Sequence, residues 1–281
     1  MYHLEGSQEV LRNSAVLSHP YLEGEGAVTQ QSLRAAYLKL LVALAPAGAY
    51  ADYLRTRISG DRVDGPPVTL YTDTSPEIDV LGAVFGHADT DRPATPAWQL
   101  DRCREGAAFI AERDAELATL MSLLTHTVFT MSAAWAGSMS ERNAIGATLI
   151  VPDEHWHTND VAEAYLHEFT HTALFLDERA KGHFQAGADQ VLLRSAIRKD
   201  ERTLPAVVHS LLVATEILTW RHQHGLEAGL EYRLHGSTQS MLDRATESYD
   251  ALTTLPTWQE DIVKDRMFQL VESAGKRLAA L

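Results

Sequence analysis

The chain has 281 residues, 45% of them hydrophobic, and a formal net charge of −14 at pH 7. This length and hydrophobic content are sufficient for one substantial core or two closely packed subdomains. The acidic balance argues against binding to nucleic acid or to an anionic membrane surface, because both need a basic face. A neutral or basic peptide, or a small molecule, is a compatible partner.

The N-terminal half is predicted to be mainly helical. Apolar residues recur at helical spacing over residues 29–57, and the Pro-Ala-Gly sequence at 46–48 is expected to divide this stretch into two helices. Residues 66–71 predict a short strand and residues 98–125 a long helix. Cys103 is the only cysteine, so we expect a small buried core residue and no thiolate metal cluster.

Residues 117–140 carry no charged side chain and are numerous enough to span a bilayer. Polar residues such as Ser122, Thr125 and His126 interrupt this run, which favours a buried helix and loop over a membrane span. The first residues, 1–6, contain neither the basic nor the apolar part of a secretion signal. We therefore expect a cytoplasmic protein without membrane contact.

The most informative stretch is His167-Glu168-Phe169-Thr170-His171, an H-E-x-x-H motif. Two histidines four residues apart on a helix lie on successive turns of one face, so both imidazoles can reach one metal ion. Glu168 can then lean toward a metal-bound water. The competing interpretation is an ordinary amphipathic helix with two half-buried histidines.

The sequence around the motif favours a metal site. Residues 147–152 form a β-prone run that ends in proline, residues 158–160 offer helix N-cap side chains, and Gly182 is a typical helix stop. Strand, short loop and metal-binding helix are the arrangement of zincin-like sites. We expect a mainly α fold with a small β element, in which this strand, the motif helix and a second ligand helix pack with additional helices. The natural division is an N-terminal mainly helical region, 1–135, and a metal-binding catalytic region, 136–281.

A catalytic metal needs a third protein ligand. Thr203 and Pro205 predict the start of another helix, which runs to about His224. On this helix His209 and Glu216 are seven residues apart, so they point in nearly the same direction, and both have apolar neighbours. Either is a candidate third ligand, and Glu216 is also a candidate for orienting a ligand imidazole.

Residues 183–203, between the two helices, are the least regular stretch, and they contain Arg198 and Arg202. A guanidinium binds a carboxylate through two parallel hydrogen bonds. A 2-oxoglutarate oxygenase needs such a group for the far carboxylate of its cosubstrate. The competing interpretation is a solvated run of charges, and if the segment is helical both arginines face the same pocket.

The remaining histidines and helices carry less information. His155 and His157 precede the motif helix and are expected on the surface, although they are close enough in sequence to line a cleft. Residues 238–252 and 256–280 predict two further helices.

The combined pattern is His167-Glu168-x-x-His171, then Ser195-x-x-Arg198-x-Asp200-x-Arg202, then His209 opening an apolar helix. It resembles the HEXXH-motif peptide-modification proteins found beside ribosomally made natural-product precursors, over about residues 140–225. The resemblance implies an Fe(II)- and 2-oxoglutarate-dependent peptide β-hydroxylase that uses O₂ on a precursor peptide. It further implies that His167, His171 and His209 bind the iron, and that Arg198 or Arg202 holds 2-oxoglutarate.

The sequence departs from the family pattern at three positions. Ile197 and Thr203 stand where the family often has an aromatic residue and a proline, and Ser210 stands where a glycine usually follows the third histidine. These departures concern the substrate class more than metal binding. Two alternatives stay open: a zinc metallopeptidase with Glu168 as general base, and a non-catalytic peptide-binding protein with a degenerate site.

Overall fold

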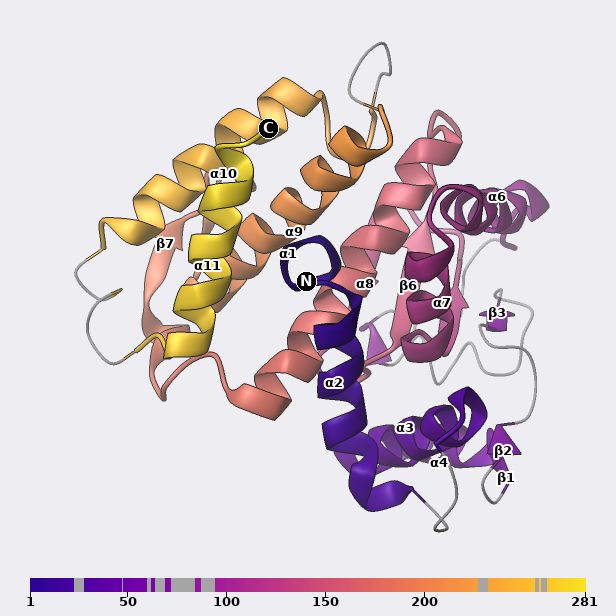
Figure 1. The fold of residues 1–281 in the computed structure, drawn as a ribbon. Coiled ribbons are helices and arrows are strands. Elements are labelled where there is room, and N and C mark those ends of the chain that lie inside the picture. The colour runs from indigo at the N-terminus through magenta and orange to yellow at the C-terminus, as the bar shows by residue number, and fades with distance from the viewer. Residues whose placement is uncertain are drawn as a thin grey trace.

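The computed structural model describes residues 1–22, 28–46, 48–59, 62–63, 69–71, 84–86, 94–226, 232–255, 258 and 262–281. Helices dominate this part of the chain, with a small sheet and two short hairpins beside them (Figure 1). The predicted fold class, mainly α with a small β element, is therefore confirmed. No helix in the described part of the chain is both long and apolar enough to cross a membrane.

The α-helices are α1 (Tyr2–Glu5), α2 (Ser7–Ser18), α3 (Gln30–Leu44), α4 (Ala49–Thr56), α6 (Ala97–Arg113), α7 (Ala115–Leu124), α8 (Thr158–Lys181), α9 (Leu204–Gln223), α10 (Thr238–Thr253) and α11 (Asp265–Leu278). Short 3₁₀ helices are η1 (His19–Tyr21) and η2 (Ala188–Gln190). The strands are β1 (Ile58–Ser59), β2 (Arg62–Val63), β3 (Thr69–Tyr71), β4 (Thr127–Phe129), β5 (Gly137–Ser140), β6 (Ala147–Val151), β7 (Leu192–Arg194) and β8 (Glu201–Thr203).

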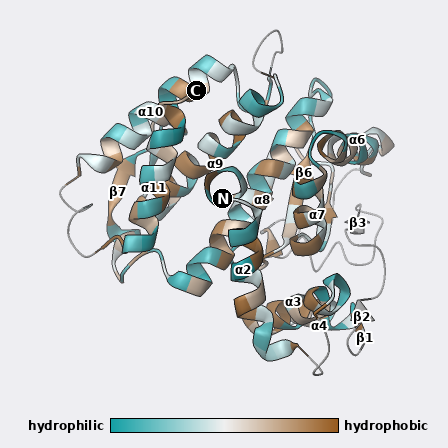
Figure 2. Ribbon diagram, viewed as in Figure 1, coloured by the Kyte–Doolittle hydropathy of each residue, from teal (hydrophilic) through white to brown (hydrophobic). Residues whose placement is uncertain are grey.

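Helices α8 and α9 lie side by side at the centre of the molecule (Figure 1). Helices α2 and α6 pack against α8, while α10 and α11 pack against α9. Most side chains of α9 between Leu204 and Arg221 are buried, as expected for a helix that is apolar on nearly every side. The outer helix α11 is instead amphipathic, with hydrophilic and hydrophobic residues alternating along it (Figure 2).

A four-stranded sheet in the order β3-β4-β6-β5 lies beside α8. Strands β3, β4 and β6 are parallel, and β5 pairs with β6 in the antiparallel sense, with Gly137 opposite Val151. Strands β4 and β6 are fully buried, whereas β5 is half-buried at the edge of the sheet. The expected division at residue 135 falls between β4 and β5, inside this sheet.

Several predicted elements need correction in their bounds. The long helix expected over 98–125 is two helices, because Asp114 leaves the helical conformation (φ −144°) and its side chain accepts a hydrogen bond from the Leu117 backbone N–H, 2.9 Å, which caps α7. The last helix begins at Asp265 and not at 256; residues 256–257 and 259–261 lie outside the described residues. The strand expected over 66–71 is observed at its second half, β3, and residues 66–68 also lie outside that part.

The stretch expected to be least regular contains a hairpin. Strands β7 and β8 pair in the antiparallel sense, with Leu193 opposite Arg202. Their connection is closed by the Ser195 N–H, which donates to the Asp200 carbonyl at 2.8 Å, and Lys199 adopts a positive φ of 65° in the turn. Because the segment is a hairpin and not a helix, Arg198 lies in the turn while Arg202 lies on a strand.

Candidate metal centre

The motif lies in the middle of α8, the longest helix of the described part of the chain. The helix begins one residue earlier than predicted: His157 is the N-cap, and its backbone N–H donates to the Asp160 carboxylate at 2.9 Å. Gly182 ends it with a φ of 71°, as predicted. Most of the helix is buried, so the motif side chains are held on a rigid element.

The two motif histidines come together as the helical spacing predicts. Nε2 of His167 and Nε2 of His171 are 3.2 Å apart. Metal ions bind imidazole nitrogens at about 2.0–2.1 Å, so two nitrogens at this separation fit as ligands of one ion. Burial lowers the pKa of His171 to about 4 and that of His167 well below its ordinary value. Both rings are therefore neutral, which is the form that binds metals.

Glu168 is buried beside this pair without a hydrogen-bond partner in the described part of the chain. Neither carboxylate oxygen makes a hydrogen bond, and Oε1 lies 3.8 Å from Nε2 of His167. Burial raises the pKa of Glu168 to about 7, and the nearby hydroxyls of Ser138 and Ser140 on β5 only partly oppose this shift. A buried carboxylate with a strongly raised pKa, placed beside two imidazoles, is typical of a functional site.

His209 and Glu216, the two candidate third ligands, have different surroundings although both are on α9. The His209 ring centroid is 5.7 Å from that of His171, and burial lowers the pKa of His209 well below its ordinary value. Glu216 faces α1, where it accepts hydrogen bonds from the backbone N–H groups of His3 (2.8 Å) and Leu4 (3.1 Å) and pairs with the Met1 amino group.

Within the described residues, no three metal-ligating side chains are gathered into a complete binding group. What the chain brings together is the imidazole pair of His167 and His171, with His209 as the neighbouring ring on a second helix. The pair fits a metal ion, and His209 is the nearby imidazole available to complete it.

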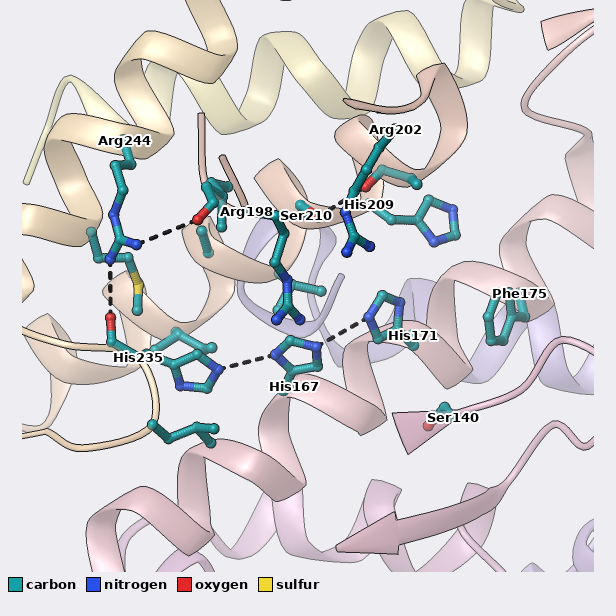
Figure 3. A pocket seen from close by; sticks show the side chains of 17 residues that line it. Ser140, His167, His171, Phe175, Arg198, Arg202, His209, Ser210, His235 and Arg244 are labelled. Carbon is teal, nitrogen blue, oxygen red and sulfur yellow. Dashed lines mark hydrogen bonds between the residues drawn. The ribbon is translucent and has the colours of Figure 1, made fainter. Parts of the chain in front are cut away.

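A cavity of about 290 Å³ opens above the motif (Figure 3). Its polar lining includes the two motif histidines, His209, and three arginines, Arg198, Arg202 and Arg244. Its apolar lining includes Ile197, Val213, Ile217, Leu234 and Met241. Glu216 does not line it. A cavity at the lower end of the usual range for small-molecule sites suits a small anionic ligand together with one side chain.

The two predicted arginines both point toward the motif imidazoles (Figure 3). Arg202 is paired with Asp200 through Nε at 2.8 Å and Nη2 at 2.9 Å, and both side chains are about half exposed. The Arg198 side chain makes no hydrogen bond or ion pair with any residue that the structure describes. Arg198 also contributes to the lowered pKa of His171, so its charge reaches the metal site.

Two residues of the site were missed in the sequence. His235 brings Nε2 to 3.1 Å from Nδ1 of His167 (Figure 3). Arg244 donates to the carbonyl oxygens of Ile197, 3.4 Å, and His235, 3.2 Å, and thereby joins the hairpin to the His235 loop. Neither belongs to a motif or a regular spacing with His167, so no local pattern marked them.

The other predicted positions behave as expected. His155 and His157 are exposed and line a separate cavity of about 830 Å³, outside the metal cavity. Cys103 is buried in α6, and burial raises the pKa of its thiol to about 12. Such a thiol is unreactive at neutral pH.

No protein-family model matches the chain, and no curated protein matches it. The activity therefore has to be inferred from the chemistry of the site. Two converging neutral imidazoles, a buried carboxylate without partners and a cationic wall are suited to a divalent metal ion with an anionic ligand beside it.

Proposed function

We propose that this chain is an Fe(II)- and 2-oxoglutarate-dependent peptide hydroxylase. The observation that carries the proposal is Arg198, a cation without a side-chain partner among the described residues, pointing into the cavity toward His167 and His171. Hydrolysis at a zinc site does not require a guanidinium there. A dicarboxylate cosubstrate, bound to the metal at one end, requires a cation for the other end.

His167, His171 and His209 would hold the iron, and this set leaves positions for the cosubstrate and O₂. The bound ion would couple oxidative decarboxylation of 2-oxoglutarate to hydroxylation: one oxygen atom of O₂ enters a peptide C–H bond, the other enters succinate, and CO₂ leaves. The apolar lining of the cavity, including Val213 and Met241, would keep water away from the reacting carbon.

Arg198 is the better candidate for the distal carboxylate. Arg202 already donates two hydrogen bonds to Asp200, and Arg244 donates to backbone carbonyl oxygens. A guanidinium without a side-chain partner can donate hydrogen bonds to both oxygens of a carboxylate without breaking an existing contact.

The position of β5 supports an extended peptide as the substrate. Within the described residues, the outer edge of β5 makes no backbone hydrogen bond, and Ser140 at its end lines the metal cavity. An unpaired strand edge binds peptides by adding a strand. A peptide paired there would pass the cavity, so that one of its side chains can enter.

A zinc metallopeptidase is the second candidate, and Glu168 favours it. A general base works best when its pKa is near the operating pH, and the pKa of Glu168 is raised to about 7. The zincin-like order of strand, motif helix and second ligand helix fits this activity equally well. In a peptidase Glu168→Gln would remove the base and most of the rate, whereas a hydroxylase would retain measurable activity.

The experiment that separates the two is a 2-oxoglutarate titration of the anaerobic Fe(II) protein, followed by its metal-to-ligand charge-transfer absorption. We expect a band in the wild type. Arg198→Ala should raise the half-saturating concentration about 30-fold or more, corresponding to about 2 kcal/mol or more for a lost charge-assisted contact. Arg198→Lys should restore little, because a point charge does not reproduce the fork.

Arg194→Ala is the matched control, since Arg194 is an exposed arginine of the same hairpin outside the cavity lining. It should leave the titration unchanged, and Arg202→Ala should have a smaller effect than Arg198→Ala. Absence of the band in the wild type would contradict the cosubstrate and make the zinc peptidase the better interpretation.

A further inference from the structure

A row of hydrogen-bonded polar side chains connects the buried Arg221 to His167 of the motif. His235 Nε2 lies 3.1 Å from His167 Nδ1, and the two rings are nearly parallel, with an angle of 9° between their planes. The other nitrogen of His235, Nδ1, lies 3.0 Å from Oε2 of Glu163. Arg221 closes the chain: its Nε and Nη2 donate to the two oxygens of Glu163 at 2.5 and 2.8 Å.

The order of these groups fixes which nitrogen carries each proton. The Glu163 carboxylate is buried and paired with the Arg221 guanidinium, so it is a hydrogen-bond acceptor. His235 must therefore donate through Nδ1–H, and in the tautomer that carries only this proton its Nε2 is an acceptor. His167 must then donate through its own Nδ1–H to His235. The lone pair of His167 is left on Nε2.

This lone pair is at the place where a metal ligand is needed. Nε2 of His167 is the atom that lies 3.2 Å from Nε2 of His171. We propose that Arg221, Glu163 and His235 preset His167 in the Nδ1–H tautomer and hold its ring, so that Nε2 faces the metal. His235 is then a positioning residue and not a ligand, because it occupies the opposite edge of the His167 ring. The inference rests on the metal site of the proposed function.

Hydrogen bonds hold the loop that carries His235 on both sides of this residue. Before it, the Asp160 carboxylate accepts the backbone N–H groups of Arg233 (2.7 Å) and Leu234 (3.0 Å). After it, Arg221 Nη1 donates to the Gly236 carbonyl at 3.1 Å. A loop held in this way presents the imidazole in one position before any ligand binds, which is how outer-shell groups raise metal affinity.

The second motif histidine has no comparable support. Nδ1 of His171 is buried and makes no hydrogen bond in the described part of the chain. The two motif histidines are thus unequal: a polar partner orients His167 through its Nδ1, whereas the Nδ1 side of His171 has only packing contacts, such as that with the Phe175 ring, whose centroid is 6.0 Å away.

The test is the affinity of the full chain for Zn(II), measured by competition with a chromophoric chelator, with Co(II) absorption as a second readout. His235→Ala should weaken Zn(II) binding by about 10–100-fold, the usual effect of removing an outer-shell partner. His235→Gln should recover part of this loss, since its amide oxygen accepts from His167 and its amide NH₂ donates to Glu163. His155→Ala, a change at an exposed histidine, should have no effect.

The outcomes separate this inference from the metal site itself. If His167→Ala abolishes binding while His235→Ala matches the wild type, the positioning role is wrong and the metal site stands. If His235→Ala abolishes binding as completely as His167→Ala, His235 is a ligand and the inference is equally wrong. If His167→Ala and His171→Ala both keep full affinity, the proposed site fails and the inference fails with it. The glutamine variant keeps a polar side chain in the loop and serves as the measurement if the alanine variant does not fold.

Discussion

Among the buried carboxylates of helix α8, Asp177 and Glu168 have opposite surroundings. Asp177 accepts hydrogen bonds from Asn13 Nδ2 and Arg266 Nη2, each at 2.7 Å, and lies 2.7 Å from Nε2 of His183. Glu168 has no partner among the described residues. Burial alone would raise the pKa of both, but His183 and Arg266 hold that of Asp177 well below its ordinary value, while that of Glu168 is raised to about 7.

The different surroundings of Asp177 and Glu168 indicate a structural role for the first and a role in the proposed site for the second. Asp177 joins α8 to α2 and α11, and its bonds are all made within the protein. Glu168 loses its hydration with only the weakly placed hydroxyls of Ser138 and Ser140 near its carboxylate, and burying a carboxylate in this way costs stability. The proposed metal ion, or a water bound to it, would give this carboxylate a partner beside the two imidazoles.

The largest expected effect is on Asp177. Asp177→Asn should lower the free energy of unfolding by about 3–5 kcal/mol, because it leaves the Arg266 charge buried with only part of its pairing. The lowered pKa means that this stabilisation is present above about pH 4 and is lost on acidification. Urea unfolding at pH 7 measures the change, and a loss below about 1 kcal/mol would remove the structural role.

Glu168 should show a pH dependence of the opposite sign. In the metal-free native state its pKa of about 7 is above the unfolded value, so between about pH 4 and 7 the native state holds a proton that the unfolded state releases. This contribution to stability falls as pH rises through that window, by about 3 kcal/mol in all. Glu168→Gln should abolish the fall, as the difference between the two unfolding curves against pH would reveal; identical slopes would contradict the raised pKa.

Local patterns in the sequence were sufficient to predict the motif helix, its end at Gly182 and the strand that precedes it. The spacing of His167 and His171 determines their convergence because both are on one helix. The break at Asp114 was missed because the apolar pattern continues through it, and the hairpin around Arg198 because its strands are too short to show alternation.

Tertiary contacts explain the rest of what the sequence left open. His209 and Glu216 point in similar directions, but they are about 10 Å apart along the helix axis, so different elements cover them. Only the fold places α1 over Glu216 and the cavity over His209. His235 comes from a distant loop, and nothing in its neighbouring residues indicates a contact with His167.

The central claim, a metal ion held by the motif pair, is tested most directly by anaerobic Fe(II) titration of the wild type and four variants. We expect one ion per chain in the wild type, in Glu216→Gln and in folded Asp177→Asn. We expect loss of binding in His171→Ala and in His209→Ala, because the remaining ligands cannot hold the ion against water. Full iron content in His171→Ala would contradict the account, and loss in Glu216→Gln with retention in His209→Ala would move the third ligand to the carboxylate.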